Sequence, residues 1–175
     1  YTLGSSESFS DEDETPHKIG LTQPLWVMQK EVDQALFSRI MSFNPAERDQ
    51  NECSRVGNKA APNPEHPVYC ISWFEALEFA NAWSEKLGYT PCYSILTQTA
   101  HLNKKCDGFR LPTESEWEAF AGVGITQRDN LEQLAWIQSN SEGMTHPVGQ
   151  KLPNGLELYD VLGNVWEWTW DWYGE

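Results

Sequence analysis

The tightest constraint on how this chain folds is its tryptophan content, nine among 175 residues. Each buried indole removes a large, flat apolar surface from water, so the core must be built around rings. Four of the nine alternate near the C-terminus, at Trp166, Trp168, Trp170 and Trp172. Period-two spacing predicts that these four share one face of a strand. We therefore expect a loop-rich fold with an aromatic core.

Length and charge narrow the class of protein further. A chain of 175 residues suits one domain with a sizeable core. No apolar run approaches the roughly 20 residues that span a bilayer. The net charge of -14 disfavours nucleic-acid partners, because it repels phosphate backbones. The same charge is compatible with hard cations such as calcium, and equally with solubility alone.

Capping signals predict two helices most clearly. Ser72 and Glu75 form a capping box, in which each side chain satisfies a free backbone N–H at the start of a helix. Gly88 is a natural stop for that helix. Thr113 and Glu116 form a second capping box, which predicts another helix from about residue 114.

The remaining elements are shorter. Asp33 is a good N-cap for a first helix, which Asn44-Pro45 should end. Residues 44–67 contain four prolines and many polar groups, and predict a long irregular loop. Residues 19–30 look extended, with Pro24 favouring an edge strand or a bulge. A short strand is expected at 92–96.

Four cysteines indicate an oxidising compartment. They are Cys53, Cys70, Cys92 and Cys106. None forms a CxxC motif, which argues against zinc, and the even number suggests two disulfides in a periplasmic or extracellular protein. Three pairings are possible; the sequential one would close loops of roughly 15 residues, worth about 3 kcal/mol each in the chain-entropy model. The alternative is four buried thiols.

A series of motifs in register identifies a family resemblance. The motifs lie at 31–34, 66–73, 108–118, 147–149 and 158–168. Together they resemble the formylglycine-generating enzyme and sulfatase-modifying factor family over essentially all 175 residues. The resemblance implies an α+β, loop-rich C-type-lectin-like fold with two to three helices and small mixed sheets, as a single domain over 1–175.

The resemblance also implies a calcium site in the loop 160–167. Family members use positions equivalent to Asp160 and Glu167 through their side chains, and to Gly163 and Val165 through their backbone carbonyls. Oxygen ligands from a compact loop suit calcium, which accepts irregular geometry. The alternative is a tight turn with solvated acids.

The family's oxidase chemistry has no visible counterpart in this chain. Active members convert a sulfatase cysteine to formylglycine with copper, held by two neighbouring cysteines beyond the tryptophan-rich motif. The chain stops at Glu175, before that region, and its cysteines match neither position. Cuprous copper requires soft thiolate ligands. We therefore expect no catalytic residue here and a non-catalytic structural or binding module. The alternative is a formylglycine-generating oxidase whose copper-binding segment is missing from this chain.

The remaining expectations concern structural residues and partners. Four residues are predicted to be structural: Arg110, Trp117, Trp166 and Trp168. The Arg110 guanidinium should hold Glu114, Glu118 or backbone carbonyls, and so tie a loop to the following helix. Because many bacterial members of the family lie in exported assemblies, a protein partner or an extracellular ligand is expected. A weaker possibility is calcium-dependent carbohydrate binding.

Overall fold

Regular structure is sparse in the computed structural model, which describes residues 2–3, 17–18, 20–21, 23–48, 62–122 and 131–172. The helices are α1 (Gln34–Met41), η2 (Pro45–Glu47), α3 (Trp73–Lys86), α4 (Glu114–Ala121) and α5 (Leu131–Leu134). The strands are β1 (Thr2–Leu3), β2 (His17–Lys18), β3 (Tyr93–Leu96) and β4 (Thr99–Leu102). This confirms the expected α+β, loop-rich fold.

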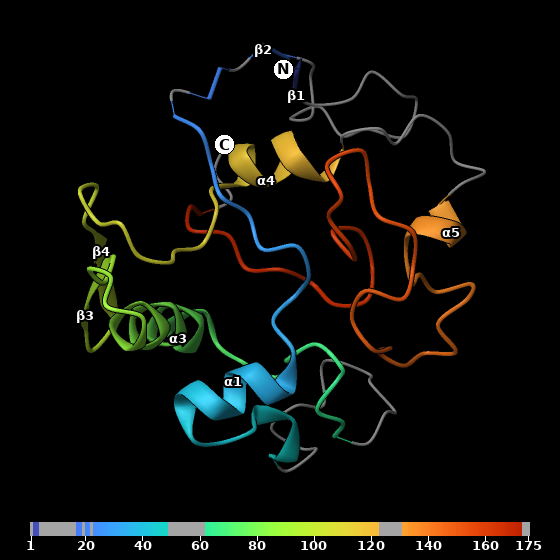
Figure 1. The fold of residues 1–175 in the computed structure, drawn as a ribbon, viewed down its shortest axis with the longest axis horizontal. Coiled ribbons are helices and arrows are strands. Elements are labelled where there is room, and N and C mark those ends of the chain that lie inside the picture. Colours follow the sequence, from blue (N-terminus) through green and yellow to red (C-terminus); the bar gives the residue numbers. More distant parts are fainter. Residues whose placement is uncertain are drawn as a thin grey trace.

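Two antiparallel pairs make up the sheets of the described residues, β1 with β2 and β3 with β4. The small sheets are as expected, but the described pairs are antiparallel where mixed sheets were predicted. In Figure 1, α3 and the β3–β4 hairpin lie on one side and the loops after α5 on the other, with the segment 23–33 between them. No helix in the described part of the chain is both long enough and apolar enough to cross a membrane.

Both predicted capping boxes are present. In α3, the Ser72 backbone N–H donates to Glu75 at 2.8 Å and the Glu75 N–H donates to the Ser72 hydroxyl at 3.2 Å. The same reciprocal bonds link Thr113 and Glu116 at the start of α4. Gly88 follows α3 with φ 82°, as a helix stop requires.

The first helix begins where the sequence predicted and ends earlier. Asp33 accepts the Leu36 N–H at 2.7 Å as its N-cap, and the helix ends at Met41. Asn44 instead caps the short η2 helix, because its side chain accepts the Ala46 N–H.

An aromatic core joins α3, the β3–β4 hairpin and the C-terminal stretch. Leu77 and Tyr93 are buried, and Trp170 stacks on Tyr93 with ring centroids 5.0 Å apart. Trp83 and Phe109 form another stacked pair, at 4.0 Å. Trp-rich composition thus predicted the kind of core that forms.

The alternating tryptophans do not form the expected strand within the described residues 165–172. The Trp170 N–H donates to the Pro112 carbonyl at 2.8 Å, an isolated contact without a ladder. Trp166 is 100% exposed, so it provides no packing, although a structural role was expected of it. Similarly, residues 23–30 contain no strand.

One predicted disulfide lies fully within the described residues. Cys92 and Cys106 are bonded, with Cα atoms 5.1 Å apart, and bracket the β3–β4 hairpin. Cys70 is also disulfide-bonded, whereas Cys53 lies outside the described residues.

Arg110 ties its loop to α4 as predicted, but its partner is Glu116. The two guanidinium nitrogens bind the two Glu116 oxygens at 2.7 and 2.8 Å, and one also binds the Leu111 carbonyl. Glu116 is the partner in place of Glu114 or Glu118, because the capping box turns its carboxylate back toward the loop. At α3, Arg48 binds the capping-box Glu75 in the same way.

We predict that Glu116→Gln makes unfolding less sensitive to acid. The bonds from Arg110 hold the pKa of Glu116 below its ordinary value. A depressed folded-state pKa stabilises the fold above the unfolded pKa, near 4.5, and this contribution is lost as the pH falls through the folded pKa. The variant should lose about 1 to 2 kcal/mol at pH 7 and less at pH 3, because Glu116 becomes protonated as the pH falls below its ordinary pKa.

Urea titrations at pH 7, 5 and 3 measure this difference. Glu114→Gln is the matched control, since Glu114 is exposed in the same helical turn. An equal loss for Glu116→Gln at pH 7 and pH 3 would contradict the assignment.

Candidate functional site

The loop 160–167 turns sharply against Trp136. Three of its residues have left-handed backbones: Asp160 at φ 55°, Gly163 at 84° and Asn164 at 53°. The Asn164 N–H donates to the Trp136 carbonyl at 2.8 Å. A Cβ on Gly163 would stand 2.3 Å from that carbonyl oxygen, so only glycine allows this approach.

The Asn164 side chain joins three segments that are distant in sequence. Its amide nitrogen donates to Glu31 at 2.8 Å and to the His146 carbonyl at 3.1 Å. Its amide oxygen accepts the His146 N–H at 2.9 Å. The His146 ring stacks on Trp136 with centroids 3.7 Å apart, which completes the support of the loop.

Three carboxylates gather where these segments meet: Glu31, Asp160 and Glu167. Asp160 is 2% exposed; one of its oxygens accepts the Gly149 N–H, and the other, Oδ1, is buried without a hydrogen-bond partner. Glu31 likewise has one buried oxygen, Oε1, without a partner. Its other oxygen is held by Asn164, and the Val165 N–H also donates to the carboxylate.

Burial and mutual repulsion disfavour the charged forms of this cluster. Burial raises the pKa of Glu31 well above its ordinary value, and the charges of Glu167 and Asp160 raise it further. Burial also raises the pKa of Asp160. The pKa of Glu167 rises to about 7, first through desolvation of its carboxylate, although the residue as a whole keeps solvent contact.

The donors of this loop and of Glu31 are oxygens, the ligand type that hard cations prefer. Within the described ranges, no three His, Cys, Asp or Glu side chains meet closely enough to hold one ion. The predicted ligand set does not need three, because two carboxylates are joined by the carbonyls of Gly163 and Val165. Two buried carboxylate oxygens without partners are what a calcium ion would satisfy, because buried charge without compensation is costly.

Two residues of this site were missed by sequence reasoning. Glu31 lies 133 positions from Asn164, and only the fold brings them together. Asn164 lay inside the predicted loop, but its side chain was given no role. Of the tryptophans predicted to be structural, Trp117 donates its indole N–H to Glu167, and Trp168 donates to the Ile71 carbonyl at 3.2 Å.

A loop-rich α+β scaffold, with a carboxylate-bearing loop before its C-terminal tryptophans, defines a C-type-lectin-like class of domain. The sulfatase-modifying factor enzyme 1-like domain matches residues 1–175, and the chain belongs to this family. The motif-based resemblance is thereby confirmed.

The chain covers a different share of the length of each relative. It is 28% identical to the chaperone protein LppX of Paenibacillus barcinonensis, over 97% of this chain and 68% of that protein. It is 32% identical to the formylglycine-generating enzyme of Thermomonospora curvata, over 67% of this chain but only 37% of the enzyme. Among solved structures, Treponema denticola variable protein 1 has a TM-score of 0.79 at 30% identity, over 100% of this chain and 70% of that chain.

We predict that Gly163→Ala lowers the stability of the fold by more than the positive φ of Gly163 alone would cause. Gly88 has nearly the same φ, 82°, but nothing lies within 4 Å of a Cβ there. Gly88→Ala should therefore cost about 1 kcal/mol, whereas Gly163→Ala adds the clash with Trp136 and should cost about 2 to 4 kcal/mol. Chemical denaturation of both variants measures the difference. Equal losses would argue against the close approach of the two backbones.

Proposed function

We propose that this domain is a non-catalytic binding or structural module, in which calcium fixes the loop 160–167. The observation that carries the proposal is the pair of buried, unpartnered oxygens on Glu31 and Asp160. Asp160 and Glu167 would bind the ion through carboxylates, and Gly163 and Val165 through carbonyls. Glu31 would add negative charge from the N-terminal segment, so that the ion joins both ends of the fold.

The cysteines that the structure describes supply no pair of thiolates for copper. A copper oxidase needs two neighbouring thiolates, and a sulfur in a disulfide is not a thiolate. Cys70, Cys92 and Cys106 are all disulfide-bonded. The disulfides also support an exported, periplasmic or extracellular location, where such bonds persist.

Two relatives support a binding role. One is named as a chaperone, a class that acts by contacting other proteins, and another as a variable protein. The similarity covers nearly all of this chain and about two thirds of each relative. We infer that the partner is a protein or an extracellular ligand.

We predict that calcium raises the melting temperature of protein previously stripped with a chelator. At calcium one hundredfold above its Kd, binding adds about 2.7 kcal/mol of stability. For a domain of this size, that corresponds to a rise of roughly 5 to 10 °C. Differential scanning calorimetry and titration calorimetry measure the shift and the affinity.

Two variants locate the ion. Asp160→Asn should abolish the calcium-dependent rise and, in chelator, melt above the wild-type protein, because it removes a buried charge beside Glu31. Glu157→Gln is the matched control, an exposed acid three positions away, and should keep the full calcium response. No heat and no shift in the wild-type protein would remove calcium from the proposal.

The oxidase alternative is favoured by the 32% identity to the formylglycine-generating enzyme and has its own test. The 175-residue protein, given cuprous copper, oxygen and a cysteine peptide with a sulfatase motif, should leave the thiol intact. Mass spectrometry of the peptide reads the result, with an active formylglycine-generating enzyme as the positive control. Conversion of the thiol to an aldehyde would refute the non-catalytic role.

A further inference from the structure

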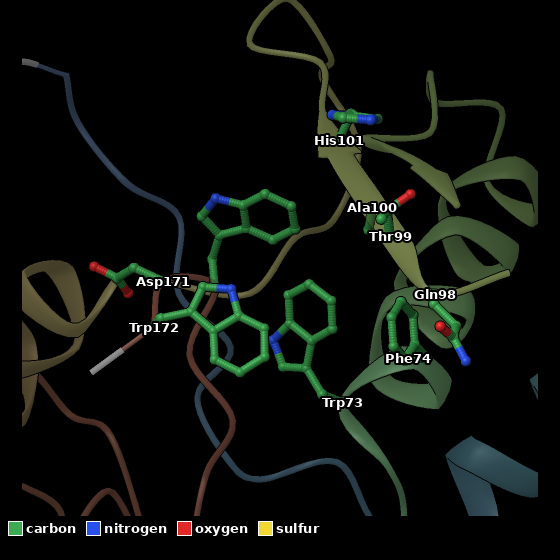
Figure 2. Close-up of a pocket in the computed structure, with 9 residues that line it drawn as sticks. Trp73, Phe74, Gln98, Thr99, Ala100, His101, Asp171 and Trp172 are labelled. Carbon is green, nitrogen blue, oxygen red and sulfur yellow. The ribbon is translucent and has the colours of Figure 1, made fainter. Parts of the chain in front are cut away.

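An aromatic pocket opens between the β3–β4 hairpin, the start of α3 and the end of the C-terminal stretch (Figure 2). Its volume is about 490 Å³, within the range of small-ligand sites. Rings dominate its lining, from Trp73, Phe74, Trp170 and Trp172, and the hairpin tip adds Gln98 and Thr99. The pocket lies apart from the carboxylates of the loop 160–167, none of which lines it.

Tyr93, Trp170 and Trp73 form a stack, and Phe74 stands across it at 82° to Trp73. Trp170 stacks on Tyr93 at an interplanar angle of 24° and on Trp73 at 28°. The Trp73 indole N–H donates to the Thr169 carbonyl at 2.8 Å, which fixes the orientation of that ring. Trp172 lies beside Trp73, tilted by 35° with ring centroids 6.3 Å apart, and is 89% exposed. Figure 2 shows the Trp73 and Trp172 indoles next to each other.

Neutral polar groups stand at the rim. Gln98 and Thr99 are exposed, and within the described part of the chain their side chains have no hydrogen-bond partner. Asp171 is the acid of the pocket lining, but one of its oxygens accepts the Glu114 N–H at 2.8 Å. Its carboxylate points away from the two labelled indoles in Figure 2.

We infer that this pocket binds a neutral carbohydrate chain made of β-linked hexopyranose units. The flat C–H face of such a sugar stacks on an exposed indole, and its hydroxyls match the free amide and hydroxyl groups of Gln98 and Thr99. A net charge of -14 disfavours an anionic ligand.

The inference rests on the proposed binding role but not on calcium. It differs from calcium-dependent sugar binding, because the ligand is held by rings and neutral hydrogen-bonding groups. Sugar binding should therefore be equal in calcium and in chelator. This separates the two proposals: a calcium shift without sugar binding refutes only this inference, and sugar binding without a calcium shift refutes only the metal.

Titration calorimetry with cellohexaose and chitohexaose tests the pocket. At least one of the two should bind the 175-residue protein, and Trp172→Ala should weaken binding about tenfold or more, because it removes an exposed stacking ring. Gln98→Ala should weaken it about threefold. Trp166→Ala is the matched control: that ring is fully exposed and does not line the pocket, so its loss should leave binding unchanged.

Three results would overturn the inference. The first is that neither hexasaccharide binds. The second is that Trp172→Ala and Trp166→Ala weaken binding equally, which would indicate non-specific contact with exposed indoles. The third is that choline or a proline-rich decapeptide binds in a Trp172-dependent way and neither sugar does, which would assign the pocket to a cation or to a peptide.

Discussion

Asparagine side chains supply many of the hydrogen bonds that a larger sheet would otherwise provide. The Asn81 amide pairs with both backbone groups of Tyr93, at 2.7 and 3.0 Å, and so attaches α3 to the hairpin. Buried Asn154 donates to the Phe120 carbonyl and accepts two backbone N–H groups of its own loop. Asn164 does the same for the carboxylate loop. Because long loops carry many backbone polar groups, a loop-rich core depends on such bonds.

Local signals in the sequence predicted α1, α3 and α4, but not the short helices η2 and α5, and contacts between distant segments could not be read from it. The capping boxes placed the starts of α3 and α4 correctly, because the bonds that form them span three residues. The tryptophan alternation predicted a strand that does not form in the described residues 165–172, because a strand also needs a neighbouring strand to pair with. The partnership of Glu31 with Asn164 depends on the whole fold, and no local pattern marks it.

Both candidate sites depend on the start of α4. Trp117 donates to Glu167 in the carboxylate loop, and the Glu114 N–H donates to Asp171 beside the aromatic pocket. The capping box and Arg110 hold that helix start in place. The short helix α4 therefore positions residues 160–172, which carry the carboxylate loop at one end and part of the aromatic pocket at the other. A non-catalytic module would present these two surfaces from one rigid support.

The Cys92–Cys106 bridge brackets the β3–β4 hairpin at its base, while Gln98 and Thr99 stand exposed at its tip. The covalent clamp at the base adds to the ladder, whose last pair at the tip is Leu96 with Thr99. The Gln98 and Thr99 side chains are both exposed, so substitutions there should cost the hairpin little stability.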